Sequence, residues 1–195
     1  MEPSHTTTSG PGPAVGLVER LVEGRPSLDA AATALAPLSA HLRGTGAWRR
    51  LVTGEAMGHA AHPFVTDLPI GFWTSSALLD LVGGPGAAAA SRRLVGAGLA
   101  TAPAAALTGV AEYAGIGSRP RRVAVVHAGL NVVSLGLYAA SWAARPRHRR
   151  RGVALGLAGL SVAGLSAYLG GHLAIGEKVG TTTVSTGSPD ELNEP

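Results

Sequence analysis

The sequence predicts an all-α integral membrane protein: a four-helix bundle with short amphipathic helices before it and a disordered tail at each end. Three observations predict this class: four long apolar stretches, few charged residues, and arginine clusters between the stretches. Charged residues make up 14% of the 195-residue chain, against about 25% in soluble domains. Mean hydropathy is +0.24. Composition and pattern therefore place most of the chain in a lipid bilayer.

The four apolar stretches define the predicted transmembrane domain, residues 58–178. We expect the spans at about 68–90, 94–113, 123–144 and 152–176. The last two are 22 and 25 residues long and carry no formal charge. A helix needs about 20 apolar residues to cross a hydrocarbon core of about 30 Å. Both are therefore long enough to cross.

The segments outside this domain have a different composition. Residues 1–13 are rich in Thr, Ser, Gly and Pro and lack the basic start of a secretory signal, so we expect a disordered tail. In residues 14–57, prolines at Pro26 and Pro37 divide an amphipathic pre-membrane segment into short helices. A loosely ordered segment is the alternative. Residues 179–195 form a second disordered tail, which is acidic.

Arginines cluster in the predicted loops, where they are typical of topology signals and lipid contacts rather than of a nucleic-acid surface. Loops one–two and three–four hold seven (Arg92, Arg93, Arg145, Arg147, Arg149, Arg150 and Arg151). The opposite side holds six basic residues near the spans (Arg49, Arg50, Arg119, Arg121, Arg122 and Lys178). The positive-inside rule then predicts a multi-pass protein of the inner (plasma) membrane with both termini outside.

Histidines and carboxylates should gather at one membrane interface. With four crossings, the start of span one, the loop between spans two and three and the end of span four lie on the same side. The residues placed there are His59, His62, Asp67, Glu112, His127 and His172. On span three, His127 shares a helical face with Asn131, Ser134 and Tyr138, so that face should point into the bundle.

Such a cluster could bind a cofactor. Imidazoles and carboxylates ligate divalent transition metals, and two histidines on facing helices can hold a b-type haem. We expect His62, His127 and His172 as cofactor ligands, with His59, Asp67 and Glu112 as further metal ligands. Two alternatives stay open: a proton relay, and histidines that only bind loop carbonyls and close the mouth of the bundle.

The chain has no cysteine, which excludes disulfides, thiolate zinc sites, an iron–sulfur cluster and covalently attached haem. Catalytic motifs are absent from the sequence as well. Residues 83–86 read GGPG, but no lysine follows as a phosphate-binding loop requires, so we interpret them as a turn or helix break. Enzymatic activity is therefore not predicted, and the alternatives are a binding or a structural role.

Several ordered sequence blocks resemble a known family. Residues 58–73 read GHAAHPFVTDLPIGFW and are followed by LLDL at 78–81, TGVAEY at 108–113, VHAGLN at 126–131 and YLGGHL at 168–173. Over about residues 40–178 this resembles the bacterial membrane family catalogued as domain of unknown function 2231. The chain departs from the family pattern at Ala60 and Ala61, which weakens the match at His59 more than at His62.

The resemblance implies four transmembrane helices and an unassigned activity. Some relatives continue into a Rieske-type iron–sulfur domain, which implies an electron-transfer setting. This chain has no cysteine for such a cluster, so a redox role would need a separate partner protein.

Two functions from different classes follow. The first is a redox-associated or metal- or haem-binding membrane component. The second is a membrane anchor or scaffold for a partner, and a transporter is a weaker third. The lipid bilayer is the expected partner in each case, nucleic acid is not, and a homo-oligomer stays open.

Overall fold

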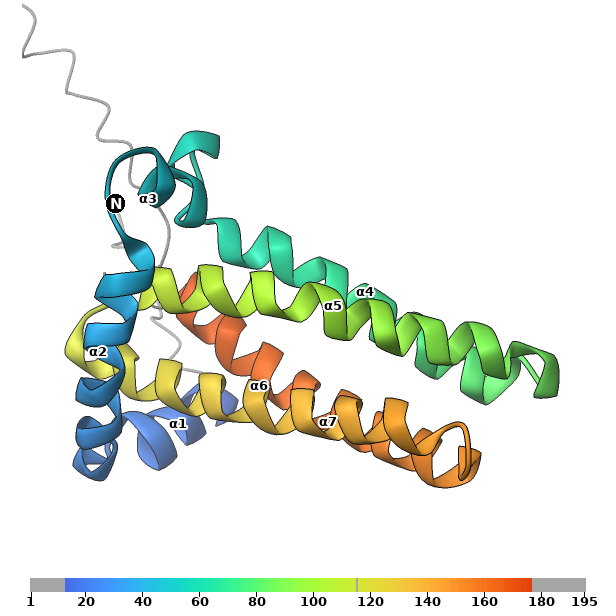
Figure 1. Ribbon diagram of the computed structural model, residues 1–195. Coiled ribbons are helices and arrows are strands. Elements are labelled where there is room, and N and C mark those ends of the chain that lie inside the picture. Colours follow the sequence, from blue (N-terminus) through green and yellow to red (C-terminus); the bar gives the residue numbers. More distant parts are fainter. Residues whose placement is uncertain (1–12, 115, 177–195) are drawn as a thin grey trace, which may run out of the picture.

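The computed structural model describes residues 13–114 and 116–176, and every element in these two ranges is a helix. Two antiparallel helical hairpins form the body of the molecule, as Figure 1 shows. The four helices are α4 (Ala61–Val82), α5 (Ala88–Tyr113), α6 (Ser118–Ala144) and α7 (Arg149–Gly171). The first hairpin pairs α4 with α5 and the second pairs α6 with α7. An all-α fold is therefore confirmed for the described residues.

Three helices are long and apolar enough to cross a membrane: Pro85–Tyr113, Ser118–Ala144 and Arg149–Ile175. Helix α4 has 22 residues but is not among the three. It carries two carboxylates, Asp67 and Asp80, which lower its mean hydropathy. Among the described residues, three helices are thus confirmed as long and apolar enough to cross a membrane, and the predicted count of four is not confirmed.

The turn between α4 and α5 lies earlier than the predicted boundary of span one near residue 90. Helix α4 ends at Val82, Gly84 takes a φ of 65°, and a 3-10 turn follows at Pro85–Ala87. A left-handed glycine followed by proline ends one helix and starts the next. Arg92 therefore lies inside α5, where its guanidinium stacks 4.2 Å from the centroid of the Trp142 ring.

We call the two ends of the bundle the loop end and the cap end. The loop end holds the turns between α4 and α5 and between α6 and α7. The cap end holds the starts of α4 and α6 and the ends of α5 and α7, where the N-terminal helices lie (Figure 1). After α7 the chain continues as a π-helical turn, η5 (His172–Gly176).

The N-terminal helices cross the cap end rather than extend the bundle. They are α1 (Pro13–Val18), η1 (Glu19–Glu23), η2 (Pro26–Leu28), α2 (Asp29–Arg43), α3 (Gly46–Val52) and η3 (Glu55–Met57). Pro26 begins a new helix as predicted, but α2 continues through Pro37. Contacts on both sides hold it: the Tyr113 hydroxyl donates to the Ala32 carbonyl (2.7 Å), and the Ser39 hydroxyl donates to the Val110 carbonyl (2.6 Å). These contacts offset the hydrogen bond that proline cannot donate.

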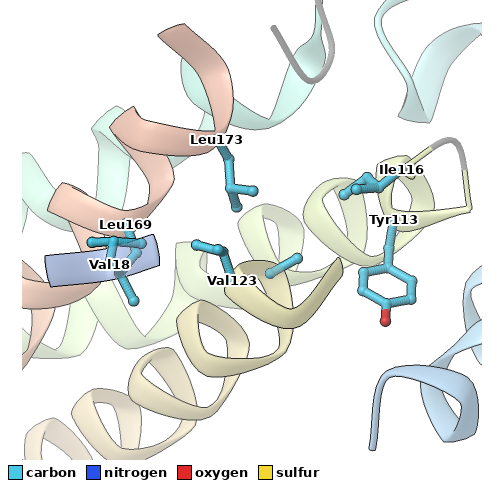
Figure 2. Close-up of a cluster of buried hydrophobic side chains, with 7 residues drawn as sticks. Val18, Tyr113, Ile116, Val123, Leu169 and Leu173 are labelled. Carbon is cyan, nitrogen blue, oxygen red and sulfur yellow. The ribbon is translucent and has the colours of Figure 1, made fainter. Parts of the chain in front are cut away.

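Two buried clusters hold the bundle together. At the cap end, Val18 of α1 joins one cluster with side chains from the end of α5, the start of α6 and the end of α7, and Figure 2 shows it beside Leu169; the cluster is Val18, Tyr113, Ile116, Val123, Ala124, Leu169 and Leu173. Nearer the loop end, Trp73 of α4 stacks on Tyr138 of α6 with 4.0 Å between ring centroids and an interplanar angle of 12°. This stack joins the two hairpins. The predicted disordered tails fall outside the described residues, except that Pro13 begins α1.

Candidate functional site

Two of the predicted ligand histidines meet at the cap end. His62 lies in the first turn of α4 and His127 lies in α6, so each comes from a different hairpin. Their ring centroids are 6.1 Å apart, and the rings are almost perpendicular at 86°. The topology argument from alternating crossings therefore brought these two residues together correctly.

The His62 ring packs against the backbone of α5. Its Nδ1 lies 2.9 Å from the Ala105 carbonyl oxygen, and the hydroxyls of Thr66 and Thr108 each lie 3.4 Å away. A carbonyl only accepts hydrogen bonds, so Nδ1 carries the proton and the Nε2 lone pair points elsewhere. Gly109 makes room for the ring, since a Cβ there would lie 2.8 Å from His62 Cε1.

The His127 ring is held by α7 in the same manner. Its Nδ1 lies 2.7 Å from the Ser166 carbonyl oxygen, which again places the proton on Nδ1. The Ser166 hydroxyl oxygen lies 3.0 Å from the His127 carbonyl oxygen and 2.9 Å from Asn131 Oδ1, and its one proton can be donated to either of them. The Asn131 amide nitrogen lies 3.0 Å from His127 Nε2, so it can donate to that lone pair. Gly170 is the matching small residue, with a would-be Cβ 3.1 Å from His127 Cε1.

This pattern matches the usual support of a ligating histidine. Such a histidine donates its second ring N–H to a carbonyl or carboxylate, which fixes the tautomer and aims the other nitrogen at the ligand. Both rings of the pair do so through Nδ1. A metal would bind the Nε2 lone pairs, and at His127 the Asn131 amide, which lies 3.0 Å from Nε2, would have to move first.

His172 does not join the pair. Its Nε2 lies 2.9 Å from Glu23 Oε1, and the two side chains are 7% and 6% exposed. Among the described residues no three His, Asp or Glu side chains form a group that could hold a metal ion. The predicted set of three histidines is therefore not assembled here. The reason is the N-terminal segment: η1 docks at the cap end and its glutamate binds the third histidine.

The other predicted ligands have different surroundings. Glu112 Oε1 accepts the backbone N–H of His62 at 3.0 Å, so its carboxylate caps the first turn of α4 rather than the His62 ring. The side chains of His59 and Asp67 are exposed. A ligand role for these three residues stays a prediction.

Sequence reasoning missed a buried ion pair at the loop end. Arg145 binds Asp80 in a bidentate manner, with nitrogen–oxygen distances of 2.7 and 3.1 Å and side chains 4% and 2% exposed. The Ser91 hydroxyl accepts from Arg145 Nη1 at 2.8 Å, and the Ser141 hydroxyl accepts from Nε at 3.2 Å. From its position at the end of an apolar run, Arg145 is predicted to be a loop charge. The one signal was the polar face of Ser76 and Asp80, which needed a cation at the same end.

Glu23 was missed for another reason. It precedes the predicted spans, so the alternation of crossings gives it no position, and nothing in its local sequence marks it as buried. The structure leaves its residue only 5% exposed, beside His172. Its partner could be found only after the N-terminal helices had been placed.

Comparison with known proteins agrees with this architecture. A search of curated proteins and a search of solved structures each found no match. A family model described as a predicted membrane protein, domain of unknown function 2231, matches residues 58–183. This range covers all four long helices and both histidines of the pair. The chain therefore belongs to the DUF2231 family of predicted membrane proteins.

Proposed function

We propose that the protein is a four-span membrane component whose His62–His127 pair binds a b-type haem and serves electron transfer. The observation that carries this proposal is the paired geometry: two imidazoles from different hairpins, 6.1 Å between centroids, each with Nδ1 on a backbone carbonyl. One metal atom between two imidazoles, with bonds of about 2 Å, gives a centroid separation of about 6 Å. The separation of the two rings would therefore allow His62 and His127 to hold one metal atom between them.

The number of ligands favours haem over a free metal ion. A zinc site takes three or four protein ligands, and the described residues offer no such group. A haem iron needs only one or two protein ligands, because the porphyrin supplies four nitrogens. A haem with two histidine ligands carries single electrons, so a separate redox protein would be the partner in this membrane.

The proposed fourth span is α4. Its 22 residues make a helix of about 33 Å at 1.5 Å per residue, enough for the hydrocarbon core. Its outward side chains are large and apolar: Phe64, Leu68, Leu78, Leu81 and Val82 are 53–73% exposed. Its charge at Asp80 is neutralised by Arg145. We place the cap end and both termini on the outer side of the inner membrane, the orientation that the positive-inside rule gives when all seven arginines of the sequence count are included.

Cysteine labelling tests the fourth span. The chain has no native cysteine, so Ala56→Cys before α4 and Gly86→Cys after it report on one helix. Both positions are exposed. If α4 crosses, a membrane-impermeant maleimide labels Ala56→Cys in intact cells, and Gly86→Cys only after permeabilisation. Labelling of both from the same side would show that α4 does not cross.

Haem titration tests the cofactor. Haemin added to the purified protein in detergent should give a sharp Soret band that saturates near one haem per chain. His62→Ala and His127→Ala should each lose the band. His59→Ala and His172→Ala are the matched controls and should keep it, because the first side chain is exposed and the second is bound to Glu23. An equal band in all four variants would exclude the pair as ligands.

The second candidate, a membrane anchor or scaffold, rests on one observation. Both ring nitrogens of His127 already have partners within the protein: Ser166 at Nδ1 and Asn131 at Nε2. Under this alternative the histidines only lock the hairpins together. A protein that binds no haem, yet loses stability in His127→Ala, would support the anchor.

A further inference from the structure

The loop end carries a group of arginines that the proposed function does not use. We name it the loop-end arginine cluster; its members are Arg92, Arg93, Arg147, Arg149, Arg150 and Arg151. The first two lie in the second turn of α5, and the others lie in the turn between α6 and α7 and in the first turn of α7. Figure 1 shows both turns at the same end of the molecule. All except Arg92 are exposed, and a surface hollow is lined by His148 and Arg149–Arg151.

Too few acidic groups lie at this end to balance the cluster. No Asp or Glu occurs between Asp80 and Glu112, or between Glu112 and Glu177. Within residues 13–114 and 116–176, the one carboxylate at the loop end is Asp80, which is already bound by the buried Arg145. Arg149 reaches it only at 3.5 Å. In the described part of the chain, the cluster therefore presents a positive surface with more arginines than carboxylates.

The cap end differs in this respect. There Arg49 pairs with Glu55 at 2.7 Å and Arg122 pairs with Asp29 at 2.6 Å. Two arginines at that end thus have a carboxylate partner within 2.7 Å, whereas in the loop-end arginine cluster only Arg149 comes near a carboxylate, at 3.5 Å. Among the described residues, the rest of the loop-end arginine cluster has no carboxylate partner.

The start of α7 is a second feature that favours binding of an anion at the loop end. The N-cap residue His148 makes no capping hydrogen bond through its side chain, and the three residues that follow are all arginine. The N-terminal end of a helix carries positive partial charge, so cations there are unfavourable unless an anion lies beside them. Phosphate oxygens would satisfy both the guanidinium groups and the helix end.

Trp142 places the cluster at the level of lipid headgroups. It lies in the last turn of α6, is 40% exposed, and its ring is covered by the Arg92 guanidinium. Tryptophan gathers where the hydrocarbon core meets the headgroups. The arginines of the adjacent turn are therefore at the depth of the phosphates rather than in bulk water.

From this arrangement we propose that the loop-end arginine cluster binds the phosphate groups of anionic phospholipids in the leaflet around it. The inference rests on the proposed membrane topology and deepens it. Anionic lipids are abundant in the cytoplasmic leaflet, where basic segments beside spans gather. Binding there anchors the loop end at the cytoplasmic face and the histidine pair at the opposite face.

Two native tryptophans allow a direct test on the full chain in vesicles. Trp142 reports on the loop end and Trp48 on the cap end, and the buried Trp73 is a constant background. In the variant Trp48→Phe the fluorescence change reports on Trp142, and in Trp142→Phe it reports on Trp48. Each is reconstituted in phosphatidylcholine vesicles that contain the same fraction of either brominated phosphatidylglycerol or brominated phosphatidylcholine. Bromine on the lipid chains quenches only tryptophans that the lipid touches.

We expect brominated phosphatidylglycerol to quench Trp142 more strongly than brominated phosphatidylcholine does, with no such preference at Trp48. The triple variant R147Q/R150Q/R151Q, made in the Trp48→Phe chain, should lose the preference. Each arginine near a membrane surface contributes about fivefold in affinity for anionic lipid, so the loss should exceed tenfold. The control R20Q/R50Q/R119Q removes the same charge from exposed positions elsewhere and should keep the preference. High salt should weaken it.

Three outcomes would overturn the inference. They are equal quenching of Trp142 by both lipids, a loss in the control as large as in the loop-end variant, and abolition of the preference by millimolar inorganic phosphate, which would make soluble phosphate the ligand. Quenching by brominated phosphatidylcholine reports insertion alone. Its absence at both tryptophans would contradict the topology, whereas its presence without an anionic preference would contradict only this inference.

Discussion

At the loop end the buried polar side chains carry opposite charges and bind one another, whereas at the cap end the paired groups are neutral imidazoles bound to backbone carbonyls. Asp80 and Arg145 are 2% and 4% exposed and satisfy each other in a bidentate pair. The His62 ring contacts the fold through Nδ1, whereas the His127 ring contacts it through Nδ1 and also has its Nε2 3.0 Å from the Asn131 amide nitrogen. The comparison teaches that a closed network is suited to hold helices together, and that a site needs polar atoms left over.

The largest effect is expected from a substitution that breaks the Asp80–Arg145 ion pair at the loop end. In Arg145→Met the Asp80 carboxylate stays buried without its partner, and the loss of one member of a buried pair costs about 3–5 kcal/mol. Unfolding in detergent, measured by steric trapping, checks this. The double variant Asp80→Leu with Arg145→Met leaves no lone charge and should be more stable than Arg145→Met. A double variant as unstable as the sum of the two single ones would show that the pair is not coupled.

The second prediction concerns the aromatic stack between the two ends. A Cβ added at Gly98 would lie 2.1 Å from Trp73 Nε1, so Gly98→Ala must displace the indole that stacks on Tyr138. Overpacking of this kind costs about 1–3 kcal/mol. Gly164→Ala is the control, because no atom lies within 4 Å of its would-be Cβ. The same unfolding assay should separate the two, and equal stability would argue against close packing here.

The third prediction concerns a substitution at the cap end that leaves both histidines unchanged. In Gly109→Ala the added Cβ would lie 2.8 Å from His62 Cε1 and would displace the ring. Because a displaced ligand loses its pre-organised geometry, the affinity for haem should fall by about tenfold. Gly129→Ala is the control: its would-be Cβ has open space around it, so this variant should bind haem as tightly as the unmodified chain does. Haem titration checks both variants. Unchanged binding in Gly109→Ala would show that the ring position is not critical.

The smallest expected effect is the pH dependence of N-terminal docking. The hydrogen-bonded Arg122 guanidinium lowers the pKa of the Asp29 carboxyl below its ordinary value. A lowered pKa in the folded state means that the contact contributes fully above the ordinary value of about 3.9 and is lost as pH falls through the lowered one. Spin labels at Ala34→Cys and Ser118→Cys should report a longer distance only at acid pH. In Asp29→Asn this change should vanish.

The sequence predicted the parts of this molecule that repeat a simple physical rule. Spans of about the length of a bilayer follow from hydropathy, and the meeting of His62 with His127 follows from alternate crossings. Even the glycine–proline turn was identified as a break, although span one was extended past it. What could not be predicted depends on docking between distant segments. Glu23 reaches His172 only because η1 folds across the cap end.

The Asp80–Arg145 pair lies between these two cases. Hydropathy counts Arg145 as a loop charge because it sits at the end of an apolar run, and no local rule separates a buried arginine from an exposed one. Its burial depends on serines from neighbouring helices, Ser91 and Ser141, that accept its remaining N–H groups. Such a network is visible only when all the helices are placed.

The central claim is that the cap-end pair, and not the closed loop end, holds a cofactor. The most direct measurement is the haem content per chain of protein purified from native membranes, determined for the unmodified chain, His62→Ala and His172→Ala. We predict about one haem per chain in the unmodified protein and in His172→Ala, and none in His62→Ala. Haem-free unmodified protein, or haem retained in His62→Ala, would contradict it.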